Sequence, residues 1–293
     1  MLMNHARNAS FGKVNAHIIG IVLKETVRRA MQSARNQLRD FEVAVKGKKE
    51  DGGDDYVTTV DKSVQTIYVR TLRECFPHIG IVAEEADLAV PSDRGYDGCF
   101  FTVDPIDGTS ALKRKQSHGI GSMVSLVWRG KIVSAWVGDV MSQEVYGYRP
   151  GSAKVHRIRD WGISEHLTIN PHQPLKSQYI LLRDNPMEFN GVLAALIGNK
   201  FKNVEVSGGS IGISAARLWK GEVGAILLMP NTEKPWDTAP VIGISQKLGF
   251  VFLRMDALDG IFVLYNPPVT NVQYKRTHPI MIVHETRLPE LIS

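Results

Sequence analysis

Residues 104–110 read Asp-Pro-Ile-Asp-Gly-Thr-Ser, and this segment has the clearest chemical potential in the chain. Asp104 and Asp107 stand three residues apart, with a proline between them and a glycine after them, so the backbone must turn and bring the two carboxylates together. Converging carboxylates repel each other unless a cation lies between them. Hard oxygen ligands with room for water suit Mg²⁺, and a phosphate oxygen can complete its octahedron. The segment therefore predicts a magnesium site that also takes a phosphate group.

The residues that follow this pair suit a phosphate as well. Gly108 lets the chain approach closely. The backbone N–H groups of Gly108, Thr109 and Ser110, at the expected start of a helix, would form an anion site. A lone Asp-Gly pair more often makes a turn that caps a helix. Carboxylates elsewhere in the sequence favour the metal site over that simpler interpretation.

Two apolar runs end abruptly in acidic residues. Residues 79–83 are followed by Glu84 and Glu85, and residues 99–103 are followed by Asp104. Both runs indicate buried strands that deliver carboxylates at their C-terminal ends.

Two further aspartates stand where helices are expected to begin. Thr58, Thr59 and Asp61 can cap a helix, so we expect Asp61 at a helix start and not in the core. Asp237 is also a good helix N-cap, and that role can coexist with metal binding.

Four of these elements, taken together and in this order, resemble the motifs of the inositol monophosphatase and fructose-1,6-bisphosphatase superfamily. The resemblance implies a layered α/β/α/β/α sandwich, made of an α+β half and an α/β half with the site between them. It also implies a cofactor of two or three Mg²⁺ ions, inhibition by lithium and a homodimer. The matching elements are Thr58-Thr59-Val60-Asp61, Glu84-Glu85, Asp104 to Ser110, and Trp236-Asp237-Thr238-Ala239-Pro240.

The resemblance assigns metal ligands position by position. Glu84, Asp104 and the backbone carbonyl of Ile106 would bind the first metal ion. Asp104, Asp107 and Asp237 would bind the second, which would steady the departing alkoxide.

The resemblance also assigns the reaction. Thr109, oriented by Asp61, would help Glu84 to activate a metal-bound water, which attacks the phosphate in line without a phosphoenzyme. The function implied is the magnesium-dependent hydrolysis of a small phosphate monoester. An aspartate-nucleophile phosphatase fits poorly, because its two aspartates lie two residues apart. A catalytically silent binding module of the same fold would lack a ligand, and none is missing from the sequence.

The substrate is less determined than the chemistry. Family members that act on inositol phosphates commonly follow Asp-Gly-Thr with a small residue and Asn-Phe, where this chain has Ser110-Ala111-Leu112, and they often have a glutamate where it has Pro230. A 3′(2′),5′-bisphosphate nucleotidase, a sugar bisphosphatase and a histidinol-phosphate phosphatase therefore stay open. Ser207 and Gly208, before a predicted helix, either bind a substrate oxygen or make a tight turn. Lys113, in Lys113-Arg114-Lys115, could contact a second phosphate.

Composition restricts the partners. The net charge of +5 comes from 35 basic and 30 acidic residues, an excess that suits a small anionic metabolite and argues only weakly for nucleic acid. The two cysteines predict no disulfide framework and favour a reducing cytoplasm. No apolar run approaches the ~20 residues of a membrane helix, so we expect no membrane partner.

The pattern of apolar residues divides the chain into an N-terminal α+β half, residues 1–160, and a C-terminal α/β half, residues 161–293, with a mostly parallel or mixed sheet. In the first half it predicts helices over 18–38 and 58–76, an exposed mobile loop over 46–55, and strands over 79–83, 99–103, 123–128, 132–137 and 144–148. In the second it predicts strands over 179–182, 204–206, 225–229, 251–253 and 261–264, with helices over 192–197, 211–220 and 237–248.

Overall fold

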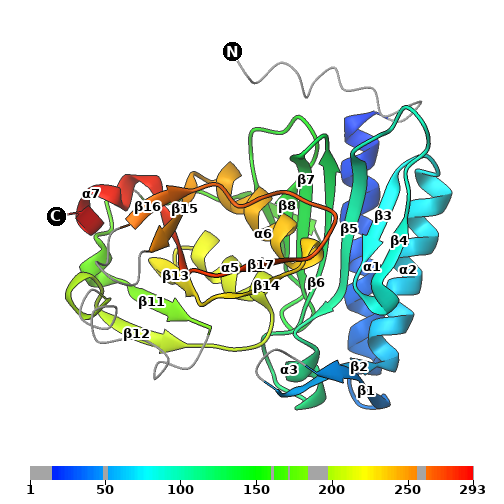
Figure 1. The fold of residues 1–293 in the computed structure, drawn as a ribbon, viewed down its shortest axis with the longest axis horizontal. Helices are drawn as coiled ribbons and strands as arrows, with labels where there is room; N and C mark the ends of the chain where they lie inside the picture. Colours follow the sequence, from blue (N-terminus) through cyan, green and yellow to red (C-terminus); the bar gives the residue numbers. More distant parts are fainter. Residues whose placement is uncertain are drawn as a thin grey trace.

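The computed structural model describes residues 15–48, 52–159, 162–170, 172–183, 197–255 and 262–292. Helices and mixed sheets alternate in layers, as expected from the sequence. Figure 1 shows this order from α1 and α2 on one side to the strands of the second sheet on the other.

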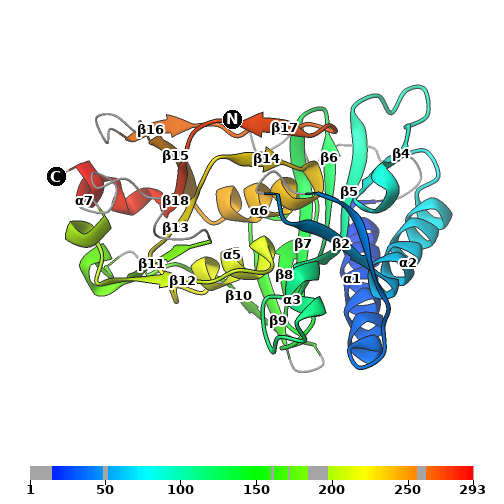
Figure 2. The same cartoon turned by 60° about the horizontal axis from the view of Figure 1, so that its bottom comes forward.

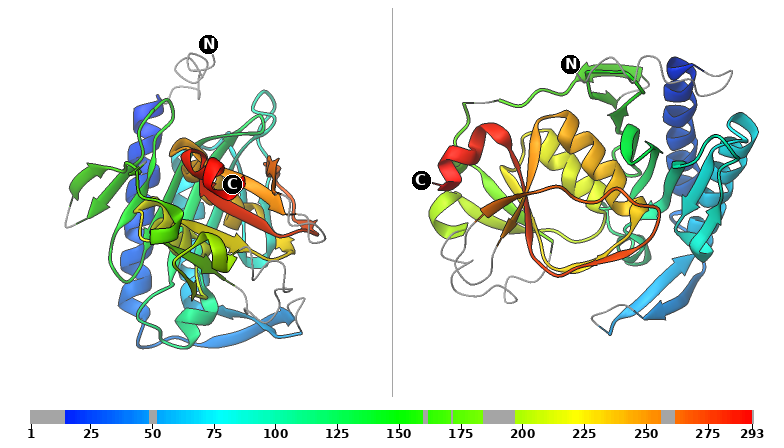
Figure 3. Two further views of the ribbon diagram at one scale, coloured as in Figure 1. Left: turned by 90° about the vertical axis from the view of Figure 1, so that its left-hand side faces the viewer. Right: turned by 45° about the horizontal axis from the view of Figure 1, so that its top comes forward.

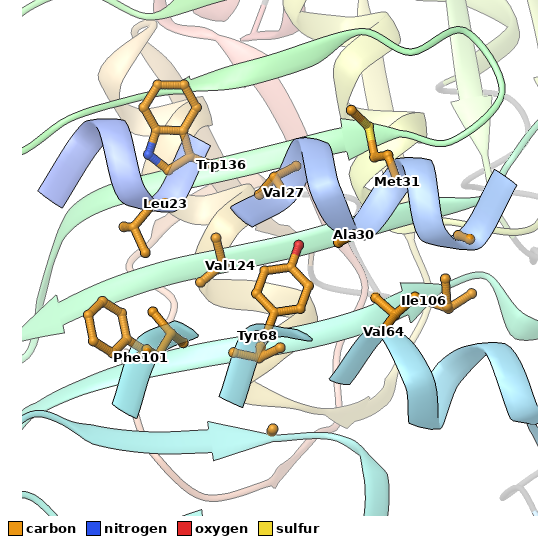
Figure 4. Packing of buried hydrophobic residues seen from close by; sticks show 14 of the residues in the cluster. Leu23, Val27, Ala30, Met31, Val64, Tyr68, Phe101, Ile106, Val124 and Trp136 are labelled. Atoms are coloured by element: carbon orange, nitrogen blue, oxygen red, sulfur yellow. The ribbon is translucent and has the colours of Figure 1, made fainter. Parts of the chain in front are cut away.

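Two long helices form the first layer. They are α1 (Ala16–Gln37) and α2 (Thr59–Cys75), which confirms both predicted helices. Their apolar faces pack on the first sheet, and Figure 4 shows Leu23 and Tyr68 reaching toward it. Thr58 caps α2 in a capping box with Asp61. The expectation that Asp61 lies outside the core is wrong, because its exposed fraction is 0%.

In the described part of the chain the first sheet has eight strands, in the order β10-β9-β8-β7-β6-β5-β3-β4. The tight turn at Arg129 and Gly130, both with positive φ, joins β6 to β7, which correspond to two of the predicted strands. The strand predicted over 99–103 continues to Asp107, and its pairing with β6 is irregular between Asp104 and Asp107. The bounds are β3 (Gly80–Ala83), β4 (Leu88–Val90), β5 (Cys99–Asp107), β6 (Gly121–Trp128), β7 (Lys131–Asp139), β8 (Val145–Tyr148), β9 (His156–Arg159) and β10 (Ile163–His166).

The exposed mobile loop predicted over 46–55 is wrong for residues 46–48, 54 and 55, which lie in strands, whereas residues 49–51 lie outside the described part of the chain. Strands β1 (Val43–Lys48) and β2 (Asp54–Thr58) pair antiparallel and form a two-stranded ribbon. Figure 3 shows this ribbon at one end of α1 and α2. Its backbone hydrogen bonds, and not a buried apolar face, define β1, whose side chains are all exposed.

Two helices form the middle layer. Helices α5 (Ile211–Trp219) and α6 (Pro235–Lys247) lie between the two sheets, as Figure 2 shows. Both were predicted, and Gly221 and Gly249, with φ of 76° and 86°, follow their ends. Buried residues lie on every face of α6, as expected for a helix between two sheets.

The second sheet is mixed, with the order β12-β11-β13-β18-β15-β16 among the described residues. Its three parallel strands, β12, β11 and β13, were predicted, whereas β18 was missed. The helix predicted over 192–197 lies, except for Ile197, outside the described residues. The bounds are β11 (Tyr179–Leu182), β12 (Asn203–Val206), β13 (Ala225–Leu228), β15 (Phe250–Met255), β16 (Phe262–Tyr265) and β18 (Ile280–His284).

Short elements complete the molecule. Leu175, Phe201 and Leu291 cover the outer face of the second sheet and make the last layer. The remaining short elements are η1 (Glu85–Asp87), α3 (Thr109–Lys113), η3 (Leu175–Ser177), β14 (Asn231–Glu233), β17 (Tyr274–Arg276), η5 (Glu285–Arg287) and α7 (Leu288–Ile292).

Three further features concern the division between the halves, the cysteines and the length of the apolar helices. The first sheet continues through β10 to His166, beyond the division expected after residue 160. Cys75 and Cys99 are both free, and Cys75 is exposed. In the described part of the chain, no helix is both long enough and apolar enough to cross a membrane.

Candidate active site

Three aspartates from two elements converge near the first sheet. Asp104 and Asp107 lie at the end of β5, and Asp237 lies in the first turn of α6. One carboxylate oxygen from each of the three lies within 4.8 Å of the other two. The irregular pairing between Asp104 and Asp107 lets the strand turn here, which brings both side chains toward α6. This is the set that the sequence suggested for the second metal ion.

Burial makes this cluster electrostatically costly. The pKa of Asp104 is raised well above its usual range by burial and by the charges of Glu84, Asp107 and Asp237. Burial likewise raises the pKa of Asp237 to about 7, although Lys234 opposes the shift. The positive charge of Lys234 therefore offsets only part of the cost of bringing these carboxylates together.

A magnesium ion fits this environment. Asp104 Oδ1 is buried and has no hydrogen-bond partner among the described residues. A buried carboxylate oxygen without a partner is unfavourable by itself, whereas a hard cation would satisfy it. The donor set consists of carboxylate oxygens, which Mg²⁺ prefers.

Asp107 is fixed by the start of α5. Its Oδ2 accepts a hydrogen bond from the Ser210 hydroxyl and another from the Gly212 backbone N–H, the latter at 2.8 Å. The sequence suggested Ser207 and Gly208 as substrate contacts. The structure brings Ser210 to the aspartate instead, while the Ser207 N–H extends the pairing of β12 with β11 through a bond to the Leu182 carbonyl. Because Ser210 is the N-cap of α5, a capping rule would have selected it from Ser-Gly-Gly-Ser.

Gly108 makes this convergence possible. Its φ is 95°, in the left-handed region. A Cβ on Gly108 would lie 2.3 Å from the Gly119 carbonyl oxygen and 2.8 Å from the Ser210 nitrogen. No other residue fits there, so the close approach expected at this glycine is confirmed. Thr109 and Ser110 begin α3 directly after it.

Thr109 and Asp61 form the pair that the sequence suggested. The Thr109 hydroxyl donates to Asp61 Oδ1 at 2.9 Å and lies 3.2 Å from the Ile106 carbonyl oxygen. Asp61 Oδ2 accepts from the Thr58 backbone N–H at 2.7 Å and from the Thr58 hydroxyl. Burial raises the pKa of Asp61, and its hydrogen bonds oppose that shift. The hydroxyl of Thr109 is thus held with a lone pair available.

Glu84 lies among lysines. Its Oε1 is 2.8 Å from Lys46 Nζ and 3.6 Å from Lys234 Nζ, and Lys46 is also 3.2 Å from Glu85 Oε1. Glu84 is not one of the three carboxylates that converge within 4.8 Å. Burial lowers the pKa of Lys46, but the hydrogen bond to Glu84 and the charges of Glu84, Glu85 and Asp55 together outweigh this effect and raise it.

Both lysines were missed from the sequence. Lys46 falls in the segment that was predicted to be a loop. Lys234 directly precedes Pro235-Trp236-Asp237, and that position was the available signal.

The basic run after Thr109 divides in space. Lys113 Nζ lies 3.4 Å from the centre of the Tyr56 ring, on the β1–β2 ribbon. Arg114 is exposed, and Lys115 turns toward Phe41. Of the three, Lys113 alone contacts the ribbon that carries Lys46.

Known sequences and structures resemble this chain along most of its length. The model of the inositol monophosphatase family matches residues 17–280. A curated relative, Nus factor SuhB of Vibrio cholerae, is 30% identical over 132 residues, which cover 45% of this chain and 48% of the relative. The putative Nus factor SuhB of Neisseria meningitidis is 24% identical and covers 70% of this chain and 76% of its own length. The alignment with the first relative thus spans about half of that protein.

Solved structures share the fold. A staphylococcal inositol monophosphatase, in a lithium-soaked inhibitory complex, superposes with a TM-score of 0.73 at 20% identity and covers 96% of this chain and 95% of its own. An inositol monophosphatase/NADP phosphatase complexed with Mg²⁺ and phosphate gives a TM-score of 0.67 at 18% identity, with 94% of both chains covered.

Proposed function

The chain belongs to the inositol monophosphatase family, and on that premise we propose that it is a magnesium-dependent phosphatase of small phosphate monoesters. One observation carries the proposal. The carboxylates of the buried Asp104 and Asp107 and of the half-buried Asp237 converge beside the hydrogen-bonded pair of Thr109 and Asp61. A cation site next to an oriented hydroxyl is what the hydrolysis of a phosphate ester requires.

The convergence of Asp104, Asp107 and Asp237 supports them as the ligands of one Mg²⁺. The family resemblance assigns Glu84, Asp104 and the Ile106 carbonyl to a second. When bound, Mg²⁺ would supply positive charge that offsets the charge developing on the phosphate and on the leaving oxygen.

The protein's own groups orient the attacking water. Because the Thr109 hydroxyl donates its hydrogen bond to Asp61, its oxygen is left to accept a hydrogen bond from water. Asp61 is itself anchored by two bonds from Thr58, so the hydroxyl cannot turn freely. Glu84, on the neighbouring strand end, would take the proton that the water loses. The attack is direct, and no side chain becomes phosphorylated.

The lysines next to Glu84 have a role before the metal binds. Lys46 and Lys234 place positive charge beside a carboxylate that the metal ion also needs. We expect both to turn from Glu84 toward the phosphate once Glu84 is occupied. By analogy with the lithium-soaked staphylococcal relative, Li⁺ would inhibit the enzyme.

A catalytically silent role is the main alternative. Some curated relatives are named Nus factor, a name that does not describe a phosphatase. The complete set of candidate ligands and the intact Thr109–Asp61 pair favour turnover in this chain.

A panel of phosphate esters tests the proposal. Purified protein with Mg²⁺ should release inorganic phosphate from at least one of inositol 1-phosphate, adenosine 3′,5′-bisphosphate, fructose 1,6-bisphosphate, histidinol phosphate and glycerol 2-phosphate. Rates of phosphate release per site rank the candidate substrates. Release no faster than that of the Asp104→Asn variant on every ester would support the silent module.

A further inference from the structure

Arg183 extends from the second half of the molecule toward the aspartate cluster. It directly follows β11, whose C-terminal end in Figure 1 points toward the half that carries α3. Its Nη2 donates a hydrogen bond to the Gly209 carbonyl oxygen. Gly209 is the neighbour of Ser210, whose hydroxyl binds Asp107. The guanidinium is thus fastened one residue away from the group that fixes a candidate metal ligand.

Arg183 and the two residues that would orient the attacking water come from different halves of the chain. The water-orienting pair, Thr109 and Asp61, comes from α3 and α2 in the first half. An in-line displacement places the leaving oxygen opposite the attacking water. The leaving group therefore lies on the side of α5, where Asp107 Oδ2 meets Ser210 and where Arg183 is fastened.

Arg183 has unused hydrogen-bonding capacity on that side. A guanidinium carries five N–H donors, and Arg183 Nε is buried without a hydrogen-bond partner among the described residues. An unmade hydrogen bond at a buried donor is unfavourable, and an acceptor on a ligand would relieve that cost. The side chain is also close enough to Asp107 for its charge to lower the pKa of that carboxyl, against the effect of burial.

Two carboxylates of the second half are already neutralised. Glu205 on β12 is paired with Arg217, and Glu233 on β14 accepts from Arg276 at 2.7 Å. Neither glutamate therefore adds an uncompensated negative charge that would repel an anionic group of a substrate.

We propose that Arg183 determines specificity by binding a second anionic group, a phosphate or a carboxylate, on the alcohol portion of the substrate. The inference rests on the proposed phosphatase function and adds the substrate class to it. A planar guanidinium suits both anions because it can donate two parallel hydrogen bonds to either. Lys113, which the sequence suggested for this task, lies over Tyr56 on the ribbon instead.

The test compares three esters that differ in the second group. Fructose 1,6-bisphosphate offers a phosphate, 3-phosphoglycerate a carboxylate, and glycerol 2-phosphate only hydroxyl groups. Arg183→Gln removes the charge but keeps an amide donor for the Gly209 carbonyl. We expect it to lower kcat/KM by about 10- to 100-fold for the preferred anionic ester, the factor for a charge-assisted hydrogen bond, and to change glycerol 2-phosphate less than about 3-fold. For the preferred anionic ester, kcat/KM of Arg183→Lys should lie between the values for Arg183→Gln and the parent.

Control variants separate the possible failures. Arg70→Gln removes an exposed arginine on α2 and should leave all three esters unchanged. If Arg183→Gln lowered kcat/KM equally for the three esters, Arg183 would only support the loop at Gly209. That result would overturn the inference and leave the proposed phosphatase function in place. If Lys113→Gln lost the preference for the anionic esters while Arg183→Gln kept it, the second anionic group would be bound by Lys113. That result would also overturn the inference. A parent protein that hydrolyses no ester would refute the proposed function itself.

Discussion

Asp104→Asn should lower kcat/KM for every phosphate ester by about 10³-fold or more, because a ligand shared by both candidate metal sites loses its charge. Several kcal/mol of charge stabilisation depend on the bound metal, and that range corresponds to a factor of this size. Calorimetric titration with Mg²⁺ should show weaker binding in the same variant. Asp97→Asn, on an exposed loop, is the matched control and should change neither quantity.

The same substitution should stabilise the metal-free protein. Asp104 is buried beside Glu84, Asp107 and Asp237, and a neutral amide of the same shape removes the repulsion. In excess chelator the melting temperature of Asp104→Asn should exceed that of the parent by roughly 2–4 °C for each kcal/mol of repulsion relieved. A lower melting temperature in chelator would contradict the view that Asp104 is held for function at a cost in stability.

The pH dependence of the free energy of unfolding follows from the direction in which the pKa values of Asp104 and Asp237 are shifted. The folded protein holds protons on Asp104 and Asp237 more tightly than the unfolded chain does, because both pKa values are raised. The free energy of unfolding of the metal-free parent should therefore fall as pH rises from about 4, the unfolded value, through about 7, the folded value of Asp237. Asp104→Asn should show a shallower fall over this range.

Thr109→Ala should lower kcat by about 10²-fold, a typical magnitude for the loss of general acid–base assistance, while the affinity for Mg²⁺ stays near that of the parent. The reason is that the Thr109 hydroxyl contacts Asp61 and the Ile106 carbonyl but is not itself one of the carboxylate ligands. Steady-state kinetics and calorimetric titration measure the two quantities separately.

Thr109→Ser is the informative partner of this variant. It keeps the hydroxyl and loses only a methyl group, so kcat should recover to within about 10-fold of the parent. If Thr109→Ala turned over like the parent, or if Thr109→Ser were as slow as Thr109→Ala, the proposed role of the hydroxyl in orienting water would be wrong.

Local patterns in the sequence predicted much of what positions this site. The capping residues Thr58 and Asp61, the apolar run before Asp104 and the glycine at 108 each have a physical cause within a few residues. Their positions in the structure follow those causes, at the start of α2, on β5 and at the turn into α3.

Contacts between distant segments were not predictable in the same way. Asp61 is buried because Thr109, 48 residues later, supplies a hydrogen bond to a carboxylate that would otherwise need water. Ser210 reaches Asp107 across 103 residues, and Arg183 reaches the same loop from β11. The ribbon of β1 and β2 has no buried apolar face in β1 to reveal it. In contrast, β18 did carry a signal, because residues 280–283 form an apolar run.

The most direct test of the account is the dependence of phosphate release on a metal ion. Phosphate release from the best ester of the panel should vanish in excess chelator and return when Mg²⁺ is restored, because the converging carboxylates of Asp104, Asp107 and Asp237 function only around a cation. Circular dichroism in chelator should show that the fold persists, so that the loss is one of chemistry. Full activity in excess chelator would contradict the account.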